Sequence, residues 1–142
     1  TICPNQLGQE AALYGLNHLS KFLERERLTI IQRKNTLGVA MKELPDWKIL
    51  SSGAFFAYVK YPMTISSVKF SELLLKEVSL LVVPGSMFES KASMKLNHDQ
   101  TFRLAFANVE KIDLEAVVDR FKTFEGLFYE KYCVQPESSL ER

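Results

Sequence analysis

Residues 101–107 alternate strictly between large apolar side chains and small or charged ones. Successive side chains of a β-strand point to opposite faces, so Phe102, Leu104 and Phe106 share one face. The opposite face carries Thr101, Arg103, Ala105 and Ala107. The alternation therefore predicts a strand that presents one arginine on the face away from its large apolar side chains.

Arg103 is flanked on its own face only by small side chains, which leave room around it. A guanidinium held on a strand presents its N–H donors in a rigid fork, which suits two parallel hydrogen bonds to a carboxylate or a phosphate. Arg103 is therefore the candidate binding residue for an anionic ligand. A surface arginine on a half-exposed strand would fit the same pattern.

Two stretches with helical spacing precede the first expected strand. Their apolar faces consist of Ala12, Leu16, Leu19 and Leu23 in the first and Ile30, Leu37, Met41 and Leu44 in the second. Pro45 ends the second stretch, because proline cannot continue a helix. One bent helix or two separate helices would fit this pattern.

The pattern changes to β-structure after Trp47. Ile49 and Leu50 precede a Ser-Ser-Gly segment that we expect to turn, and the aromatic and β-branched run 55–61 follows it. Two strands or one bulged strand would fit.

The second half of the chain adds two helices and two strands. Ser66 or Ser67 is expected to cap a helix whose apolar face consists of Phe70, Leu73, Leu74 and Val78. Asp113 is expected to cap a final helix whose apolar face consists of Leu114, Val117, Val118 and Phe121. Between these helices we expect an extended segment over 80–83, a turn at 84–85 and a polar surface loop over 89–100. The order predicts an α/β fold of the two-layer kind, a small mixed or antiparallel sheet covered by helices.

Composition argues against several classes of function. The formal net charge is +1 and no block of lysine and arginine occurs, which disfavours binding to nucleic acid or to an anionic membrane surface. The longest apolar runs have the length of strands, well short of a membrane span. Cys3 and Cys133 lack the density of a disulfide scaffold and the spacing of a zinc site, which favours a reduced, cytoplasmic protein.

Two weaker chemical patterns do not support a catalytic or metal site. Ser66 and Lys69 have the spacing of an acylating serine motif, but its partner motifs are missing and a helix cap explains the serine. His18 and His98 have no neighbours at the spacing of metal ligands, so we expect no metal site.

The turn at 84–88 offers backbone N–H groups and a hydroxyl at the end of a strand. Gly85, Ser86 and Phe88 are therefore candidates for lining a ligand cleft. The aromatic run 55–61 could stack on bases, but no basic groove accompanies it, and an aromatic strand is more often part of a core. The residues expected in the core on this ground are Phe55, Phe56, Tyr58 and Tyr61.

Four segments in order resemble the C-terminal small domain of class I and II, fold-type I aminotransferases, the pyridoxal-phosphate-dependent aspartate aminotransferase family. Residues 1–16 resemble the family's proline-punctuated entry into a Gln-x-Ala-Ala helix. Residues 53–56 resemble its Gly-x-Phe-Tyr strand, and residues 82–85 resemble its strand-to-turn corner. Residues 102–106 resemble its arginine-containing strand. After Phe88 the family usually has a glycine-bearing loop, which this chain lacks.

The resemblance implies that Arg103 binds the α-carboxylate of an amino acid or a 2-oxo acid substrate. In the family the lysine that holds pyridoxal 5'-phosphate and the phosphate-binding residues belong to a large domain. Lys69 lacks the Gly and Arg residues that follow the family's lysine, so it does not take that role. The resemblance thus implies no catalytic residue and no cofactor-binding residue on this chain.

The resemblance also divides the chain into an interdomain helix over 1–27, the small domain over 28–134 and a flexible tail over 135–142. Because the chain starts abruptly at Thr1, we expect a piece of a longer aminotransferase that is inactive alone and exposes an apolar patch on its first helix or adjoining strands. The implied partners are an N-terminal large domain and a second copy in a homodimer. A related pyridoxal-phosphate lyase or synthase is an alternative, as is a stand-alone, non-catalytic binding module.

Overall fold

The structure is a computed structural model that describes residues 4–88 and 100–133. Its elements in chain order are α1 (Gln6–His18), α2 (Ser20–Ala40), the 3-10 helix η1 (Met41–Glu43), β1 (Lys48–Gly53), β2 (Phe56–Lys60), α3 (Ser67–Val78), β3 (Val83–Pro84), the 3-10 helix η2 (Gly85–Phe88), β4 (Thr101–Ala105) and α4 (Lys111–Tyr132). This order confirms the predicted α/β fold.

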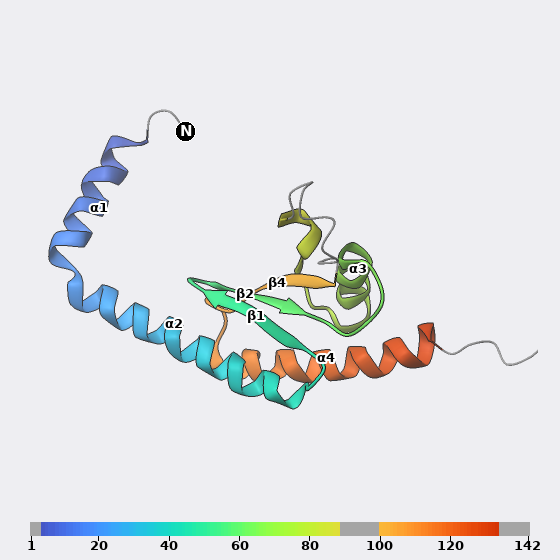
Figure 1. The fold of residues 1–142 in the computed structure, drawn as a ribbon. Coiled ribbons are helices and arrows are strands. Elements are labelled where there is room, and N and C mark those ends of the chain that lie inside the picture. Colours follow the sequence, from blue (N-terminus) through green and yellow to red (C-terminus); the bar gives the residue numbers. More distant parts are fainter. Residues whose placement is uncertain (1–3, 89–99, 134–142) are drawn as a thin grey trace, which may run out of the picture.

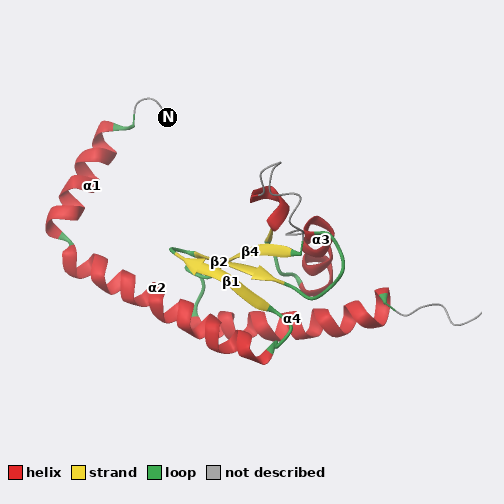
Figure 2. Cartoon of the chain, in the orientation of Figure 1, coloured by secondary structure: helices red, strands yellow, loops and turns green. Residues whose placement is uncertain are grey.

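The strands form one sheet in the order β1-β2-β4-β3, and every neighbouring pair is antiparallel. Figure 2 shows β1, β2 and β4 of this sheet side by side. The sequence left a mixed or an antiparallel sheet open, and the structure has the antiparallel one. β4 lies between β2 and β3, so the arginine strand is flanked on both sides. Arg103 is paired with Tyr58 of β2 and with Val83 of β3.

One face of the sheet packs on the core. Phe102 of β4 is fully buried, and its ring centroid lies 5.3 Å from that of Phe70 on α3 and 5.6 Å from that of Phe121 on α4. Trp47 and Tyr61 complete this aromatic cluster, with ring centroids 6.2 Å and 6.3 Å from Phe102. Aromatic side chains bury large apolar areas, and this cluster joins the sheet to two helices.

Helices α2 and α4 pack against each other and run below the sheet in Figure 1. Arg33 on α2 donates hydrogen bonds to the carbonyl oxygen of Ala107 and to Oε1 of Glu110, the second over 3.3 Å. Both residues lie in the segment between β4 and α4, so α2 holds the segment that follows the arginine strand. Among the described residues, no helix is both long and apolar enough to cross a membrane.

The β1–β2 hairpin corrects the expected position of the turn. Ser51, Ser52 and Gly53 belong to β1, and the chain reverses at Ala54 and Phe55 instead. Ala54 adopts a positive φ of 46°, which serves the tight reversal. The register shifts between residues 49 and 51, so a bulge and two strands are both present.

The helix starts agree with the sequence in one case and differ in the other. Oγ of Ser66 accepts a hydrogen bond from the backbone N–H of Lys69, which confirms the predicted cap of α3. The cap of α4 is Glu110, not Asp113. Asp113 lies three residues further on and accepts from the Glu110 backbone N–H in a capping box. The sequence therefore identified a residue of the capping box correctly, but Asp113 occupies its third helical position and not the cap position.

Only part of the segment 80–83 forms a strand. β3 contains Val83 and Pro84, so the strand begins three residues later than expected and includes the proline. The tail 135–142, the residues 89–99 of the expected loop, Cys3 and His98 lie outside the described part of the chain.

Residues 4–28 form an arm that projects from the rest of the molecule in Figure 1. The arm breaks at Leu19 into α1 and α2, inside the first expected stretch, and α2 then runs without a break from the end of that stretch through most of the second. Two helices are present, but the break between them is not where the two patterns meet. No residue of α1 is buried. The large apolar side chains that the arm exposes are Leu7, Leu13, Tyr14, Leu16, Leu19, Phe22, Leu23 and Leu28. This confirms the predicted exposed apolar patch on the first helix.

Candidate functional site

Arg103 lies on the face of the sheet opposite the aromatic core. Its guanidinium carbon is 4.3 Å from the ring centroid of Phe56 and 4.5 Å from that of Phe88. Phe56 starts β2 and Phe88 ends η2, so the two rings come from different elements. The sequence predicted open room around Arg103, and this was wrong, because rings from neighbouring elements occupy that space.

The surroundings of Arg103 leave its donors available. A cation over an aromatic ring is attracted by the negative face of the ring, and a guanidinium suits this contact because it is planar. The N–H donors of the group lie in its plane. Within the described residues, no oxygen accepts a hydrogen bond from the Arg103 guanidinium, and no carboxylate forms an ion pair with it. The site therefore consists of a partly exposed cation with its position restricted by two rings.

The corner that follows β3 is packed tightly against β2 and β4. A Cβ atom on Gly85 would lie 2.0 Å from Oγ1 of Thr101 and 2.7 Å from Oη of Tyr58, so only glycine fits there. The hydroxyl of Tyr58 donates to the Gly85 carbonyl oxygen over 3.2 Å and lies 3.0 Å from Oγ1 of Thr101, which donates to it. Gly85 is buried, and in this structure it serves the close approach of the corner to the sheet.

Ser86 connects the corner to the start of α3. Its backbone N–H donates to Oγ of Ser67 over 3.2 Å, and the Ser67 hydroxyl donates to Oγ of Ser86 over 2.9 Å. Ser67 is fully buried. The two adjacent serines therefore make different interactions. Ser66 caps α3, and Ser67 forms hydrogen bonds with Ser86 in the corner that carries Phe88.

Two of the four aromatic residues that we expected in the core are exposed instead. Tyr61 is fully buried and Tyr58 is half-buried, but Phe55 and Phe56 are 50% and 38% exposed. Phe55 lies in the turn. Phe56 points to the face of Arg103, as the alternation with the buried Ala57 and Val59 would have indicated. Sequence analysis therefore missed Phe56 as a neighbour of Arg103, although the signal was present.

The other candidates from the sequence lie away from Arg103 and do not form a site with it. Lys69 is exposed on α3 and forms an ion pair with Glu72 over 3.8 Å. His18 lies on α1, where its ring stacks on that of Tyr14. Neither residue has surroundings that would activate it for chemistry.

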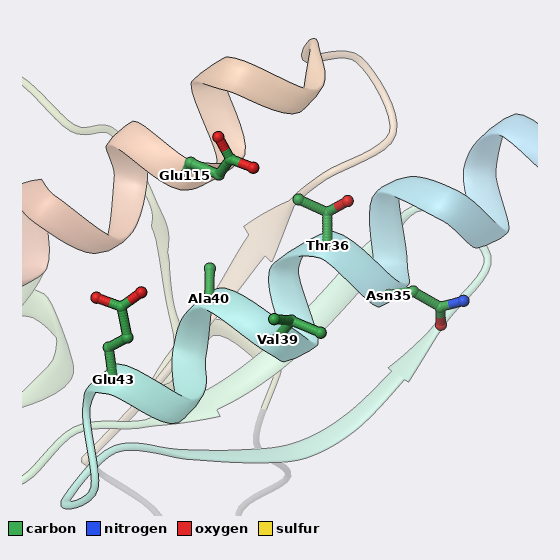
Figure 3. A pocket seen from close by; sticks show the side chains of 6 residues that line it. All are labelled: Asn35, Thr36, Val39, Ala40, Glu43 and Glu115. Atoms are coloured by element: carbon green, nitrogen blue, oxygen red, sulfur yellow. The ribbon is translucent and has the colours of Figure 1, made fainter.

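A hollow of about 400 Å³ lies between α2 and α4, away from Arg103. Figure 3 shows Glu115 of α4 facing Thr36 and Ala40 of α2 across this hollow. Its remaining lining residues are Asn35, Val39 and Glu43. The hollow is an open groove between helices, and its few polar groups do not converge on one point, so it is a weaker candidate than Arg103.

The perturbed charges of the described residues lie on the helices and not around Arg103. A hydrogen bond from Lys131 on α4 lowers the pKa of Glu77 on α3, and the same bond raises the pKa of Lys131. The atoms Nζ and Oε2 of this pair are 2.6 Å apart. Glu43 likewise raises the pKa of Lys122 through a hydrogen bond. These pairs hold helices together and supply no acid or base to the Arg103 face.

Comparison with known proteins identifies the same family over most of the chain. Residues 1–121 match the family model described as aminotransferase class I and II. The chain is similar to the aspartate aminotransferase of Bacillus subtilis, with 27% identity over 85% of this chain and 30% of that protein. It is also similar to an aromatic-amino-acid aminotransferase of Thermococcus litoralis, with 35% identity over 58% of this chain and 20% of that protein.

Solved structures agree with this match. A PLP-dependent aminotransferase from Streptococcus suis superposes with a TM-score of 0.71 and 25% sequence identity, over 90% of this chain and 32% of that chain. The present chain thus spans about a third or less of the length of the relatives that it matches.

Proposed function

Because this chain belongs to the aminotransferase class I and II family, we propose that it acts as the small domain of a pyridoxal-phosphate-dependent enzyme that transfers an amino group between an amino acid and a 2-oxo acid. The activity belongs to a longer chain that includes a large domain. We expect the 142 residues alone to be inactive.

Arg103 is the residue that we propose to bind the substrate α-carboxylate. The observation that carries this proposal is a guanidinium on the uncovered side of the sheet with no acceptor among the described residues. A carboxylate would accept two parallel hydrogen bonds from such a group, which fixes the orientation as well as the position of the substrate. Lysine would supply the charge but not the planar fork.

The described residues do not fit the cofactor itself. Lys69, considered above as the lysine that would hold the cofactor, is solvent-exposed and forms an ion pair with Glu72. It lies on α3 and not beside Arg103. Pyridoxal phosphate, when bound by the large domain, would supply the electron sink for the chemistry at the substrate Cα. The role of this chain is to bind the substrate carboxylate and to exclude water from it when the two domains close.

The exposed arm fits a role as the connection to the large domain. Its apolar side chains are covered by nothing in the described structure, and exposed patches of this kind mark interaction surfaces. We propose that residues 1–27 form an interdomain helix, that residues 28–134 form the small domain, and that the complete enzyme is a cytoplasmic homodimer. The isolated chain should then self-associate, and strictly monomeric sedimentation at high concentration would speak against this.

The amino donor is left open by this proposal. One relative is called an aspartate aminotransferase and another an aromatic-amino-acid aminotransferase, so membership alone does not select a side chain. A carboxylate-binding arginine would serve a related pyridoxal-phosphate lyase or synthase equally well. Product analysis with a labelled amino acid would separate transfer of the amino group from elimination or condensation.

The test uses the longer protein that carries this segment, as wild type and as Arg103→Lys. We expect the visible absorbance band of the cofactor to change when an amino acid is added, and to change at much higher amino acid concentration in the variant. Equal responses in both proteins would rule out the role of Arg103. A protein without any cofactor band would rule out the aminotransferase and favour a binding module.

A further inference from the structure

Phe56 and Phe88 contact Arg103 from two different elements, and burial explains only part of where their side chains lie. Phe88 is 48% exposed and Phe56 is 38% exposed, so both rings keep much of their surface in solvent. The hydrophobic effect acts only on the buried part of each ring. What the two rings share is the guanidinium between them, 4.3 Å and 4.5 Å from their centroids.

We propose that Phe56 and Phe88 are positioning residues that hold the Arg103 guanidinium in the orientation in which it binds a carboxylate. This inference rests on the proposed function of Arg103 and adds the means by which the side chain is ordered. An arginine side chain has several rotatable bonds, and ordering it before the ligand arrives lowers the entropic cost of binding. Two rings this close to its guanidinium carbon restrict where the guanidinium can move, while the N–H donors that no described residue accepts from stay available for the ligand.

The placement of Phe88 depends on the corner that precedes it. Gly85 is fixed by the hydroxyl of Tyr58, and Ser86 is fixed by the buried Ser67 at the start of α3. The ring of Tyr58 also meets that of Phe88 edge-on, with centroids 6.4 Å apart. Phe56 is fixed differently, by its pairing with Ala105 on the neighbouring strand. The two rings therefore reach the guanidinium from two different elements, both of which are anchored on β2.

The first test uses the 142-residue chain itself and needs no cofactor. NMR of the Arg103 side chain, labelled at Nε, should show the Hε proton shifted upfield by the two rings. In Phe88→Leu and in Phe56→Leu this shift should shrink, and in Phe88→Tyr it should persist. Tyr129→Leu is the matched control, since Tyr129 is 46% exposed on α4 and no arginine of the described residues lies over its ring. An Hε resonance that is the same in all five proteins would overturn the proposal.

The second test measures kinetics in the longer protein that carries this segment. Losing one cation–π contact should raise KM for the amino acid about two- to fivefold in Phe88→Leu, with kcat nearly unchanged. Phe88→Tyr should restore KM, because tyrosine keeps the aromatic face. A KM that stays at the wild-type value, or one that Tyr does not restore, would overturn the proposal. If Arg103→Lys also leaves KM unchanged, the proposed function fails. If KM rises in Arg103→Lys but not in Phe88→Leu, only the positioning role is rejected.

Discussion

The two faces of the sheet share one backbone and have opposite surroundings. On the face toward the helices, Phe102 and Leu104 of β4 are 0% and 4% exposed and join an aromatic cluster. On the other face, at alternate positions of the same strand, Arg103 is half-buried and Ala105 is exposed. The rings that touch Arg103 are themselves partly in solvent.

This difference separates the residues that stabilise the fold from those that we expect to serve function. A core residue is held by many apolar contacts, so changing it lowers the free energy of unfolding. Arg103 has two ring contacts and no described acceptor, so its removal should leave the fold nearly intact. Variants on the two faces should therefore differ in which property they change, and each of the following experiments tests that division.

The largest effect on stability is expected for Phe102→Ala. The ring is fully buried between Phe70, Phe121 and Trp47, and its loss leaves a cavity in the centre of the cluster. The free energy of unfolding should fall by about 3–5 kcal/mol, measured by denaturant titration. Phe55→Ala is the control, because that ring is 50% exposed and should cost less than about 1 kcal/mol. Equal losses in the two variants would contradict the assignment of the faces.

Gly85→Ala tests the point where the corner meets both faces. The added Cβ would clash with Oγ1 and the carbonyl oxygen of Thr101, so the corner has to move. We expect a loss of about 1–3 kcal/mol in the free energy of unfolding. Gly126→Ala is the matched control, since nothing lies within 4 Å of its Cβ and alanine favours a helix. A harmless Gly85→Ala would mean that the corner is not packed as described.

Arg103→Lys should separate stability from binding. The variant loses two ring contacts at a partly exposed site, so the free energy of unfolding should change by about 1 kcal/mol or less. The same variant should lose most carboxylate binding in the longer protein, because lysine lacks the planar fork of donors that binds both carboxylate oxygens. A destabilisation as large as that of Phe102→Ala would place Arg103 with the structural residues.

Glu77→Gln tests the helix side and should have the smallest effect. The hydrogen bond from Lys131 lowers the pKa of Glu77 in the folded state, so this bond stabilises the fold above the ordinary pKa of glutamate, about 4.3. That contribution is lost as the pH falls through the lowered pKa. The difference in Tm between wild type and variant should therefore be greatest near neutral pH and vanish in acid. A difference that grows on acidification would contradict the sign of the shift.

The parts of the fold that could be read from the sequence were those with a strong local period. The alternation at 101–107 placed Phe102 and Arg103 on opposite faces, and short polar side chains narrowed the cap of α3 to Ser66 or Ser67, of which Ser66 is the cap. What failed depended on pairing and hydrogen bonds rather than on residue type. The turn at Ala54 and the position of Asp113 in its capping box are set by register and by a reciprocal hydrogen bond, which residue types alone do not fix.

The candidate site shows the same limit. The sequence indicated Arg103 from its own strand, but the ring of Phe88 reaches it from a corner fifteen positions earlier, after β3 has paired with β4. The neighbouring small residues suggested empty space, and only the sheet order shows what fills it. Long-range pairing is thus the information that the local pattern lacks.

The most direct measurement is a crystal structure of the longer protein with a bound amino acid or 2-oxo acid. We expect both carboxylate oxygens about 2.7–2.9 Å from guanidinium nitrogens of Arg103, with the guanidinium still between the rings of Phe56 and Phe88. A carboxylate bound by other residues, with Arg103 turned to solvent, would contradict the central claim that this arginine binds the substrate.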